Sequence, residues 1–392
     1  MGSLRFPRHQ DVTMMNAFVK GCLTLTPGLT IYSASGKRRR PVRRENASKV
    51  CSRIAWRKPM DTSRSFYFQS TNQSIGKEPV LLLSAEDLKK RLTPEIGFAA
   101  LNAAYKALAQ DPDSEPKTLG FKVDDGSFHI KAGVYPKSRH FFAAKLNANF
   151  PGNHRHNLPT IQGLVVLVEG AKGVPLAVMD SGELTAIRTA AANALAASHG
   201  ARPNSRVATI IGCGFQSGYV LEAFQNVLPL KQVFAYDRDT KRAKAFAGAY
   251  HGKGGVMVEA VQDFTAATGS SDVIITCTTS KSPVLMKDHV RPGTFIAAVG
   301  ADNAEKQELD PELFRDAAIL VDDLEKCALE AELHHALAAG VTTKENVRAD
   351  LCQLASGQVK GRETDDEIVI FDSLGTGLQD VALAWAAYEA SA

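Results

Sequence analysis

Residues 206–218 read Arg206-Val-Ala-Thr-Ile-Ile-Gly-Cys-Gly-Phe-Gln-Ser-Gly218, and this stretch decides how the rest of the chain is interpreted. The apolar run 207–211 predicts a buried strand, and the glycines after it predict a turn into a helix. Gly212 permits the tight turn, Gly214 lets the backbone approach a pyrophosphate, and Ser217 is small enough for close helix–strand packing. The stretch therefore predicts a dinucleotide-binding turn. The alternative is a packing turn without a ligand.

The next predicted strand, 232–236, supports the cofactor hypothesis because it ends in an acid. Asp237 lies 25 positions after Gly212, where a carboxylate would bind the adenosine ribose hydroxyls. Its charge would repel a 2′-phosphate and so favours NAD, whereas the neighbouring Arg238 leaves NADP open. The predicted cofactor-binding residues are Gly212, Gly214, Phe215, Gln216, Ser217, Asp237, Arg238 and Thr276.

Strands and helices alternate downstream of residue 206, which indicates a parallel sheet with helices on both faces. With the two strands already named, strands are expected at 207–211, 232–236, 256–260, 272–277, 294–299 and 318–321. A long helix at 324–339, a strand at 367–371 and a helix at 378–389 are expected to follow. The predicted fold class is α/β, with a Rossmann-type parallel-sheet domain (202–325) inserted in an α+β domain (78–201 plus 326–392) that binds substrate and forms a dimer.

The α+β part begins with a short strand near Pro79. A helix capped by Ser84 follows, with Asp87 at its third position, and a second helix starts after Pro94. Residues 128–168 alternate like several strands, with PGNHRHNLP as a loop. The strand PLAVMD then leads into a helix that runs to about His199 and is capped by Asp180 or Ser181.

The charge is unevenly distributed along the chain. Residues 1–77 carry 15 Lys and Arg against three acids, whereas the rest carries 31 against 39. The first segment is predicted to be a disordered basic leader or an over-extended start, with a transit peptide or a nucleic-acid-binding tail as alternatives. The acidic main body argues against nucleic-acid binding.

Other classes of protein are excluded by composition and spacing. No apolar run approaches the roughly 18 residues that span a bilayer, so no membrane association is expected. The six cysteines form no CxxC pair, which fits reduced thiols and a cytoplasmic location. No histidine has the partners that zinc sites use, so no metal site is predicted.

Three side chains are candidates for substrate chemistry. Lys145 lies on an otherwise apolar strand face and Arg188 in an Ala-rich helix, where a ligand carboxylate could reach its guanidinium. The alternative for both is a salt bridge. Asp302 follows the strand 295–299 at the carboxyl edge of the sheet, where it could exchange a proton with a substrate. The alternative for Asp302 is a turn or helix cap.

Several longer strings resemble the ornithine cyclodeaminase/mu-crystallin family, in its order and spacing, from about residue 79 to the end. They are Lys145-Leu-Asn-Ala-Asn-Phe-Pro-Gly, Pro159-Thr-Ile-Gln-Gly, Met179-Asp-Ser-Gly-Glu-Leu-Thr-Ala-Ile-Arg188-Thr-Ala-Ala, Gly212-Cys-Gly-Phe-Gln, Val299-Gly-Ala-Asp302-Asn-Ala-Glu-Lys306-Gln-Glu-Leu and Asp372-Ser-Leu-Gly-Thr-Gly-Leu-Gln-Asp380.

The resemblance implies roles for individual residues. Those matching Lys145 and Arg188 hold the substrate α-carboxylate, and the one matching Thr160 adds a hydroxyl. Family members also use an upstream arginine, for which Lys117 is the nearest match and lacks the two-pronged geometry. Asp302 would be catalytic, and Lys306 either orients it or caps the loop.

The same resemblance implies an NAD(P)-dependent homodimer that transfers hydride at the α-carbon of a small amino or imino acid. A dehydrogenase or ketimine reductase would turn over the cofactor. An ornithine cyclodeaminase would release ammonia, form proline and leave NAD unchanged. A third alternative is a non-catalytic binding protein of the mu-crystallin type, against which Asp302 argues.

Overall fold

The computed structural model describes residues 73–74, 79–111, 116–136 and 140–391. The predicted leader, residues 1–77, lies outside these ranges except for β1 (Gln73–Ser74), which pairs with β2 (Pro79–Leu83). Among the described residues, no helix is both long and apolar enough to cross a membrane.

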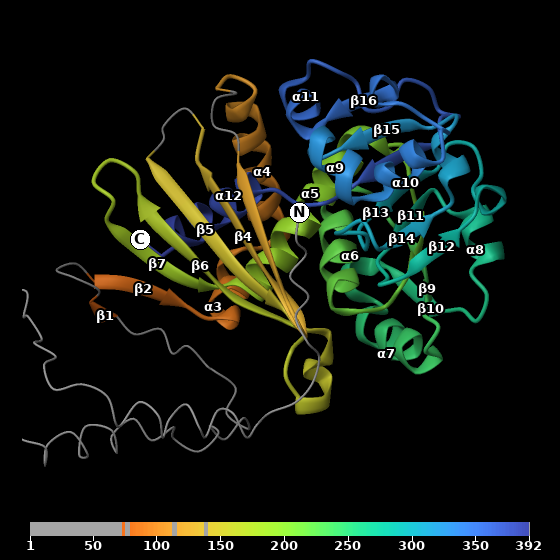
Figure 1. Cartoon of the computed structure of the whole chain (residues 1–392). Coiled ribbons are helices and arrows are strands. Elements are labelled where there is room, and N and C mark those ends of the chain that lie inside the picture. The colour runs from red at the N-terminus through yellow and green to blue at the C-terminus, as the bar shows by residue number, and fades with distance from the viewer. Residues whose placement is uncertain (1–72, 75–78, 112–115, 137–139, 392) are drawn as a thin grey trace, which may run out of the picture. The chain divides into compact units, whose positions relative to one another are not determined.

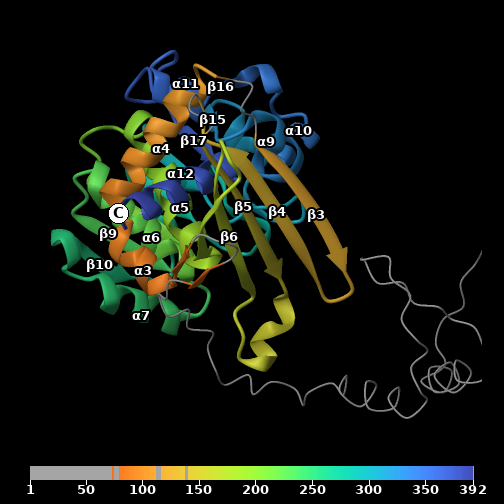
Figure 2. The same ribbon diagram turned by 90° about the vertical axis from the view of Figure 1, so that its left-hand side faces the viewer.

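The first of two large sheets is mostly antiparallel and is built by the amino-terminal half of the described chain. Its order is β1-β2-β7-β6-β5-β4-β3. The remaining strands are β3 (Lys117–Val123), β4 (Gly126–Val134), β5 (Phe141–Asn149), β6 (Ile161–Glu169) and β7 (Pro175–Asp180). The sequence missed β3, because this edge strand, seen at the rim of the sheet in Figure 2, is exposed throughout and shows no buried face.

Helices cover one face of this sheet. The helices α3 (Ala85–Arg91), α5 (Ser181–Gly200) and α12 (Gly377–Glu389) contact its strands, whereas α4 (Pro94–Leu108) packs on α5 and α12, and α11 (Leu351–Ser356) packs on α4 and α5. The predicted caps are confirmed at Ser84, which forms a capping box with Asp87, and at Asp180, whose carboxylate accepts the Glu183 N–H at 2.7 Å. The last helix, α12, packs on β4, β5 and β6 behind the strands of Figure 1.

The helix α5 is buried on nearly all sides, and seven of its 20 residues are alanine, whose small side chains allow close packing. It contacts α4 and α12 on the first sheet and also α6 (Phe215–Val227) and the strands β13 (Phe295–Ala298) and β17 (Val369–Asp372) of the second. The single helix α5 therefore packs against both sheets, and its side chains lie between them.

The second sheet is entirely parallel, in the order β10-β9-β8-β11-β13-β17-β15-β16. Its other strands are β8 (Val207–Ile211), β9 (Gln232–Tyr236), β10 (Met257–Ala260), β11 (Val273–Thr276), β15 (Ala318–Val321) and β16 (Val347–Asp350). From β8 the chain adds β9 and β10 on one side, and it then adds β11 and β13 on the other side. The strand order thus reverses between β8 and β11, and doubly wound folds bind their ligands at such a point. The predicted α/β fold class with a Rossmann-type sheet is confirmed.

The parallel sheet continues past residue 325, because β16 and β17 are hydrogen-bonded members of it. A boundary at residue 325 thus cuts through the sheet, and the division into domains stays a prediction. The expected helix 324–339 is two helices, α9 (Leu324–Glu330) and α10 (Glu332–Ala338). Asp372, at the end of β17, accepts the N–H groups of Glu332 and Leu333 and so caps a new helix there.

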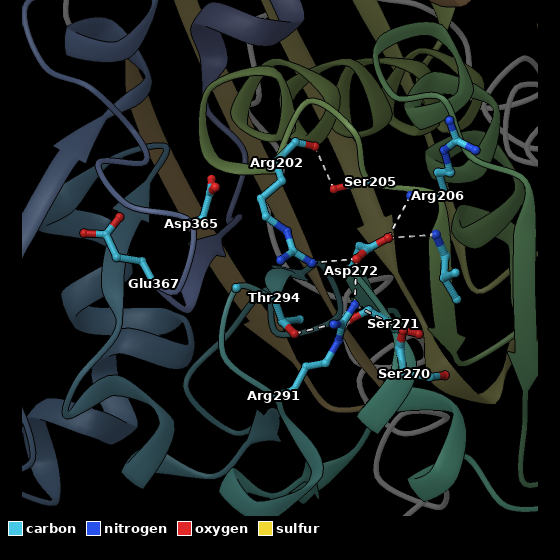
Figure 3. A network of polar contacts seen from close by, with 12 residues as sticks. Arg202, Ser205, Arg206, Ser270, Ser271, Asp272, Arg291, Thr294, Asp365 and Glu367 are labelled. Atoms are coloured by element: carbon cyan, nitrogen blue, oxygen red, sulfur yellow. Dashed lines mark hydrogen bonds and ion pairs between the residues drawn. The ribbon is translucent and has the colours of Figure 1, made fainter.

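A polar network closes the amino-terminal edge of the parallel sheet (Figure 3). The Asp272 Oδ1 atom lies 2.6 Å from a guanidinium nitrogen of Arg202 and 2.6 Å from one of Arg291, while Oδ2 accepts the N–H of Arg206 at 2.7 Å and of Val207 at 3.1 Å. The bonds to backbone and both guanidinium groups outweigh burial and lower the pKa of Asp272. The carboxylate thereby ties the chain after α5 to the starts of β8 and β11.

Candidate active site

The glycine turn after β8 has the geometry that a dinucleotide requires. Gly212 has a φ of +97°, and a Cβ there would lie 2.5 Å from the carbonyl oxygen of Cys277, so only glycine fits. Gly214 is the N-cap of α6, makes no side-chain cap bond and has open space where a Cβ would be. The first N–H groups of α6 can therefore face a phosphate at close range.

Two small residues hold α6 against its surroundings. Ser217 is buried, and its hydroxyl donates to the Gly214 carbonyl at 2.8 Å. A Cβ on Gly218 would overlap the hydroxyl of Tyr250 on α7 (Thr240–Tyr250). Gly218 thus allows α6 to approach Tyr250 of α7 closely, while Ser217 stabilises the turn itself.

Asp237 lies directly after β9, beside the glycine turn. Its carboxylate is buried and accepts the N–H of Cys213 at 3.0 Å and of Asp239 at 2.9 Å. These bonds orient the carboxylate and leave further lone pairs for hydroxyl donors. Arg238 follows it and is exposed. Asp237, which favours NAD, and Arg238, which would allow NADP, are therefore neighbours at the end of β9.

The other three predicted cofactor residues have different surroundings. Phe215 is exposed and packs its ring against Tyr219. Gln216 donates to the Ala186 carbonyl at 2.9 Å and so joins α6 to α5. The hydroxyl of Thr276 is buried and donates to Glu308 at 2.8 Å, which gives Thr276 a part in holding the loop after β11.

Lys145 and Arg188 meet at one carboxylate, that of Asp380 on α12. Lys145 Nζ lies 2.8 Å from Asp380 Oδ1 and 3.2 Å from the Thr185 hydroxyl, and Arg188 Nε lies 3.6 Å from the same Oδ1 atom. Arg188 Nη1 also donates to Gln379 at 2.9 Å, whereas its buried Nε has no hydrogen-bond partner among the described residues. Burial outweighs Asp380 and lowers the pKa of Lys145 to about 7.

Lys131 is a third cation at this place, which the sequence analysis missed. It is paired directly opposite Lys145 on β4, and its Nζ atom donates to the carbonyl of Gly375 at 2.8 Å. Burial lowers its pKa, as does the nearby Arg188. The pairing register of β4 and β5 would have revealed Lys131, but that register depends on a hairpin that the sequence does not specify.

Acids and amides from the carboxyl-terminal motif complete the cluster. Asp322 is buried and accepts the N–H groups of Leu374 and Gly375 at 3.2 and 2.5 Å and the Gln379 amide at 3.2 Å. Burial raises its pKa despite these bonds. Gln379 and Asp380 therefore contact the cluster from the first turns of α12. They belong to the string Asp372-Ser-Leu-Gly-Thr-Gly-Leu-Gln-Asp380, in which the sequence predicted no role for either residue.

Asp302 follows β13 at the carboxyl edge of the parallel sheet. Its side chain is 46% exposed and forms an ion pair of 2.7 Å with Lys306. Lys306 also donates to the Gly300 carbonyl at 3.2 Å, so it both orients the acid and closes the loop. The strand before Asp302, β13, pairs with β17, which precedes the turn whose Leu374 and Gly375 carbonyls accept from Lys131. The acid and the cation cluster therefore lie at the same edge of the sheet.

Two predicted substrate residues lie away from this cluster. Lys117 is exposed on β3 and pairs with Ala132, one position from the row that joins Thr118, Lys131 and Lys145. Because side chains alternate along a strand, Lys117 is on the opposite face. Thr160 is exposed just before β6, five residues from Val165, the partner of Lys145, which is roughly 16 Å along the strand.

The described part of the chain holds no group of three or more His, Cys, Asp or Glu side chains that could bind a metal ion. The buried Cys213 beside Asp237 also has little nucleophilic character, since burial raises its thiol pKa to about 12.

Comparison with known proteins identifies the lineage. The profile of the "Ornithine cyclodeaminase/mu-crystallin family" matches residues 81–392. Alanine dehydrogenase of Archaeoglobus fulgidus is 36% identical over 79% of this chain and 94% of its own length. Iminosuccinate reductase of Paracoccus denitrificans is 32% identical over 79% of this chain and 96% of its own.

Solved structures agree with this assignment. The Δ1-pyrroline-2-carboxylate reductase of Thermococcus litoralis, in complex with NADH and L-proline, has a TM-score of 0.76 and 30% identity, covering 80% of this chain and 97% of that one. An archaeal alanine dehydrogenase dimer with bound NAD has a TM-score of 0.75 and 35% identity, covering 80% of this chain and 96% of that one. The resemblance drawn from the motifs is confirmed, and the chain belongs to the ornithine cyclodeaminase/mu-crystallin family.

Proposed function

We propose that the protein is an NAD(H)-dependent oxidoreductase that interconverts a small α-amino acid and its imine. The observation that carries this proposal is that Asp302 and the cation cluster lie at one edge of the parallel sheet, where Rossmann folds bind their cofactor. Asp302 follows β13, and the turn at Leu374 and Gly375, whose carbonyls accept from Lys131 beside Lys145, follows the adjacent strand β17. A proton-transfer group and a carboxylate-binding cluster thereby adjoin one predicted cofactor position.

The residues around the glycine turn fit a nicotinamide dinucleotide. Gly212, Gly214 and the start of α6 would hold the pyrophosphate, and Asp237 would accept the ribose hydroxyls. When bound, the cofactor supplies or takes the hydride at the substrate α-carbon. NAD is favoured because relatives of similar fold are named in complex with NAD or NADH and because Asp237 repels a 2′-phosphate. Arg238 keeps NADP open.

The cation cluster would bind the substrate carboxylate. Arg188 has a free Nε donor, and Lys145 can exchange part of its contact with Asp380 for a second anion. Asp302 would exchange a proton with the substrate nitrogen while Lys306 holds it in place. Asp380 and Gln379 would position Lys145 and Arg188.

Net oxidation or reduction is favoured over cyclodeamination, since the relatives described above are named dehydrogenases and reductases. The assay supplies NADH with Δ1-pyrroline-2-carboxylate or with pyruvate and ammonium, and supplies NAD with ornithine. Oxidation of NADH supports the proposal. Ammonia from ornithine without net NADH indicates a cyclodeaminase. Binding of NADH without either reaction indicates a mu-crystallin-like binding protein and overturns the proposal.

The protein is also proposed to act as a homodimer through the uncovered face of the antiparallel sheet. Leu119, Ile130, Leu146 and Leu164 form one cross-strand row on β3 to β6. Leu119, Leu146 and Leu164 are 59%, 47% and 37% exposed. A continuous row of exposed apolar side chains is typical of a protein–protein interface. A relative of the same fold is named as a dimer.

Light scattering after size exclusion tests this assembly. Leu146→Asp should give a monomer, whereas Leu329→Asp, at a leucine of α9 that is also exposed but lies outside the row, should leave the mass unchanged. A monomeric wild-type protein would exclude the dimer. The cytoplasmic location remains a prediction from the sequence.

A further inference from the structure

Lys131 and Lys145 are directly opposed on neighbouring strands, an arrangement that costs free energy unless an anion lies nearby. The nitrogen atoms of Lys145 and Arg188 converge on Asp380. Lys131 instead points to the turn before α12, where it donates to the carbonyls of Gly375 and Leu374 at 2.8 and 3.4 Å. Among the residues that the structure describes, Lys131 has no ion-pair partner within 4 Å, so its charge is not locally neutralised.

The cluster as a whole carries a surplus of positive charge. It holds three cations (Lys131, Lys145 and Arg188) and two acids that face them, Asp380 and Asp322. Below about pH 7, where Lys145 keeps its proton, one positive charge remains with both acids ionised, and protonation of Asp322 would increase the surplus. Asp302 does not change this balance because Lys306 neutralises it.

An amino acid with one carboxylate and a protonated amine is neutral, whereas one with a second, side-chain carboxylate carries one negative charge. The charge of a dicarboxylic amino acid therefore balances the surplus positive charge of the cluster. Lys131 offers a cation for its second carboxylate, separate from Lys145 and Arg188, which share Asp380. A lysine that only capped the two carbonyls would add no preference between these substrates.

We infer that Lys131 is a specificity-determining residue that binds a second carboxylate, and that the preferred substrate is a short dicarboxylic α-amino acid or its imine. This inference rests on the proposed function and narrows its substrate class. In the reductive direction the C=N double bond becomes a single bond, a hydride from NADH forms the Cα–H bond, and a proton that Asp302 takes up from solvent forms the N–H bond. NADH is oxidised to NAD.

The test compares kcat/KM for L-aspartate and L-alanine with NAD in the full-length protein and in Lys131→Gln. A charged hydrogen bond is lost only with aspartate, so the ratio of the two values should exceed 10 in the wild type and fall by about 10- to 100-fold in the variant. Lys131→Arg should retain most of the ratio. Lys231→Gln, at an exposed lysine just before β9, is the matched control and should leave the ratio unchanged.

Inhibition of the unmutated protein provides a test that does not depend on the folding of a variant. Succinate should inhibit alanine oxidation at least 10-fold more strongly than propionate, because only succinate reaches Lys131 with a second carboxylate. Equal inhibition, or an equal loss of both activities in Lys131→Gln, would overturn the role of Lys131. If NADH binds but no amino or imino acid reacts, the proposed oxidoreductase function itself fails, so the two failures are distinguishable.

Discussion

Lys145 Nζ lies 2.8 Å from Oδ1 of Asp380, and both side chains are almost completely buried. The contact joins β5 to α12 across more than 200 residues of sequence. A buried ion pair of this kind does little for stability relative to apolar packing, but it holds an ammonium group where a substrate carboxylate is proposed to bind. Its protonation state should therefore govern substrate affinity.

The pH dependence of kcat/KM should follow Lys145. Its pKa is lowered to about 7, first by burial, so the ammonium is present below about pH 7 and lost above it. We expect kcat/KM to fall as pH rises through that value, with the Kd for NADH unaffected. Steady-state kinetics from pH 6 to 9 beside a fluorescence titration of NADH measure both. A profile that is flat between pH 6 and 8.5 would contradict this role.

Asp302→Asn should lower kcat by about 10²- to 10⁴-fold with KM little changed, because an amide keeps the shape but cannot accept a proton. NADH binding should be retained. Asp124→Asn, in the exposed turn between β3 and β4, is the control. Near-normal kcat in Asp302→Asn would show that this acid only shapes its loop.

Arg188→Lys should raise KM while the Kd for NADH stays constant. The substitution keeps the charge but loses the planar group that contacts Gln379 and presents a free Nε. Loss of a charged hydrogen bond predicts an increase in KM of about 10- to 100-fold. A parallel increase in the Kd for NADH would place Arg188 nearer the cofactor than proposed.

Gly218→Ala should destabilise the fold by about 1–3 kcal/mol, because the new methyl group overlaps the Tyr250 hydroxyl. Adding Tyr250→Phe removes that hydroxyl and should restore part of the loss. Gly248→Ala, on α7 where a Cβ meets nothing within 4 Å, should be neutral or slightly stabilising. Urea unfolding gives all three values, and the absence of rescue would mean that α6 shifts as a whole.

Asp272→Asn should destabilise the protein because the four donors around the carboxylate then face an amide group (Figure 3). The native pKa of Asp272 is below its usual value, so its contribution is complete above about pH 4 and is lost as pH falls further. Unfolding midpoints of wild type and variant should therefore converge in acid. Asp288→Asn, at an 85% exposed carboxylate, should leave the midpoint unchanged at all pH values.

Local patterns predicted much of the fold correctly. The glycine turn, the strand that ends in Asp237 and the helix caps at Ser84 and Asp180 depend on neighbours within a few residues, so they can be recognised in the sequence. The helix 324–339 was predicted wrongly as continuous, since the cap that divides it comes from Asp372, more than 30 residues away. The edge strand β3 was missed because it has no buried face.

The sequence by itself determined the class of fold, the cofactor-binding turn and the chemical types of the groups at the site, among them Lys145, Arg188 and Asp302. Only the tertiary structure decided which of these groups meet. The register of β4 against β5 adds Lys131, and the packing of α12 adds Gln379 and Asp380. The register of β3 places Lys117 on the opposite face of the sheet from Lys131. Strand register and helix docking are determined by contacts between distant segments, which no local pattern specifies.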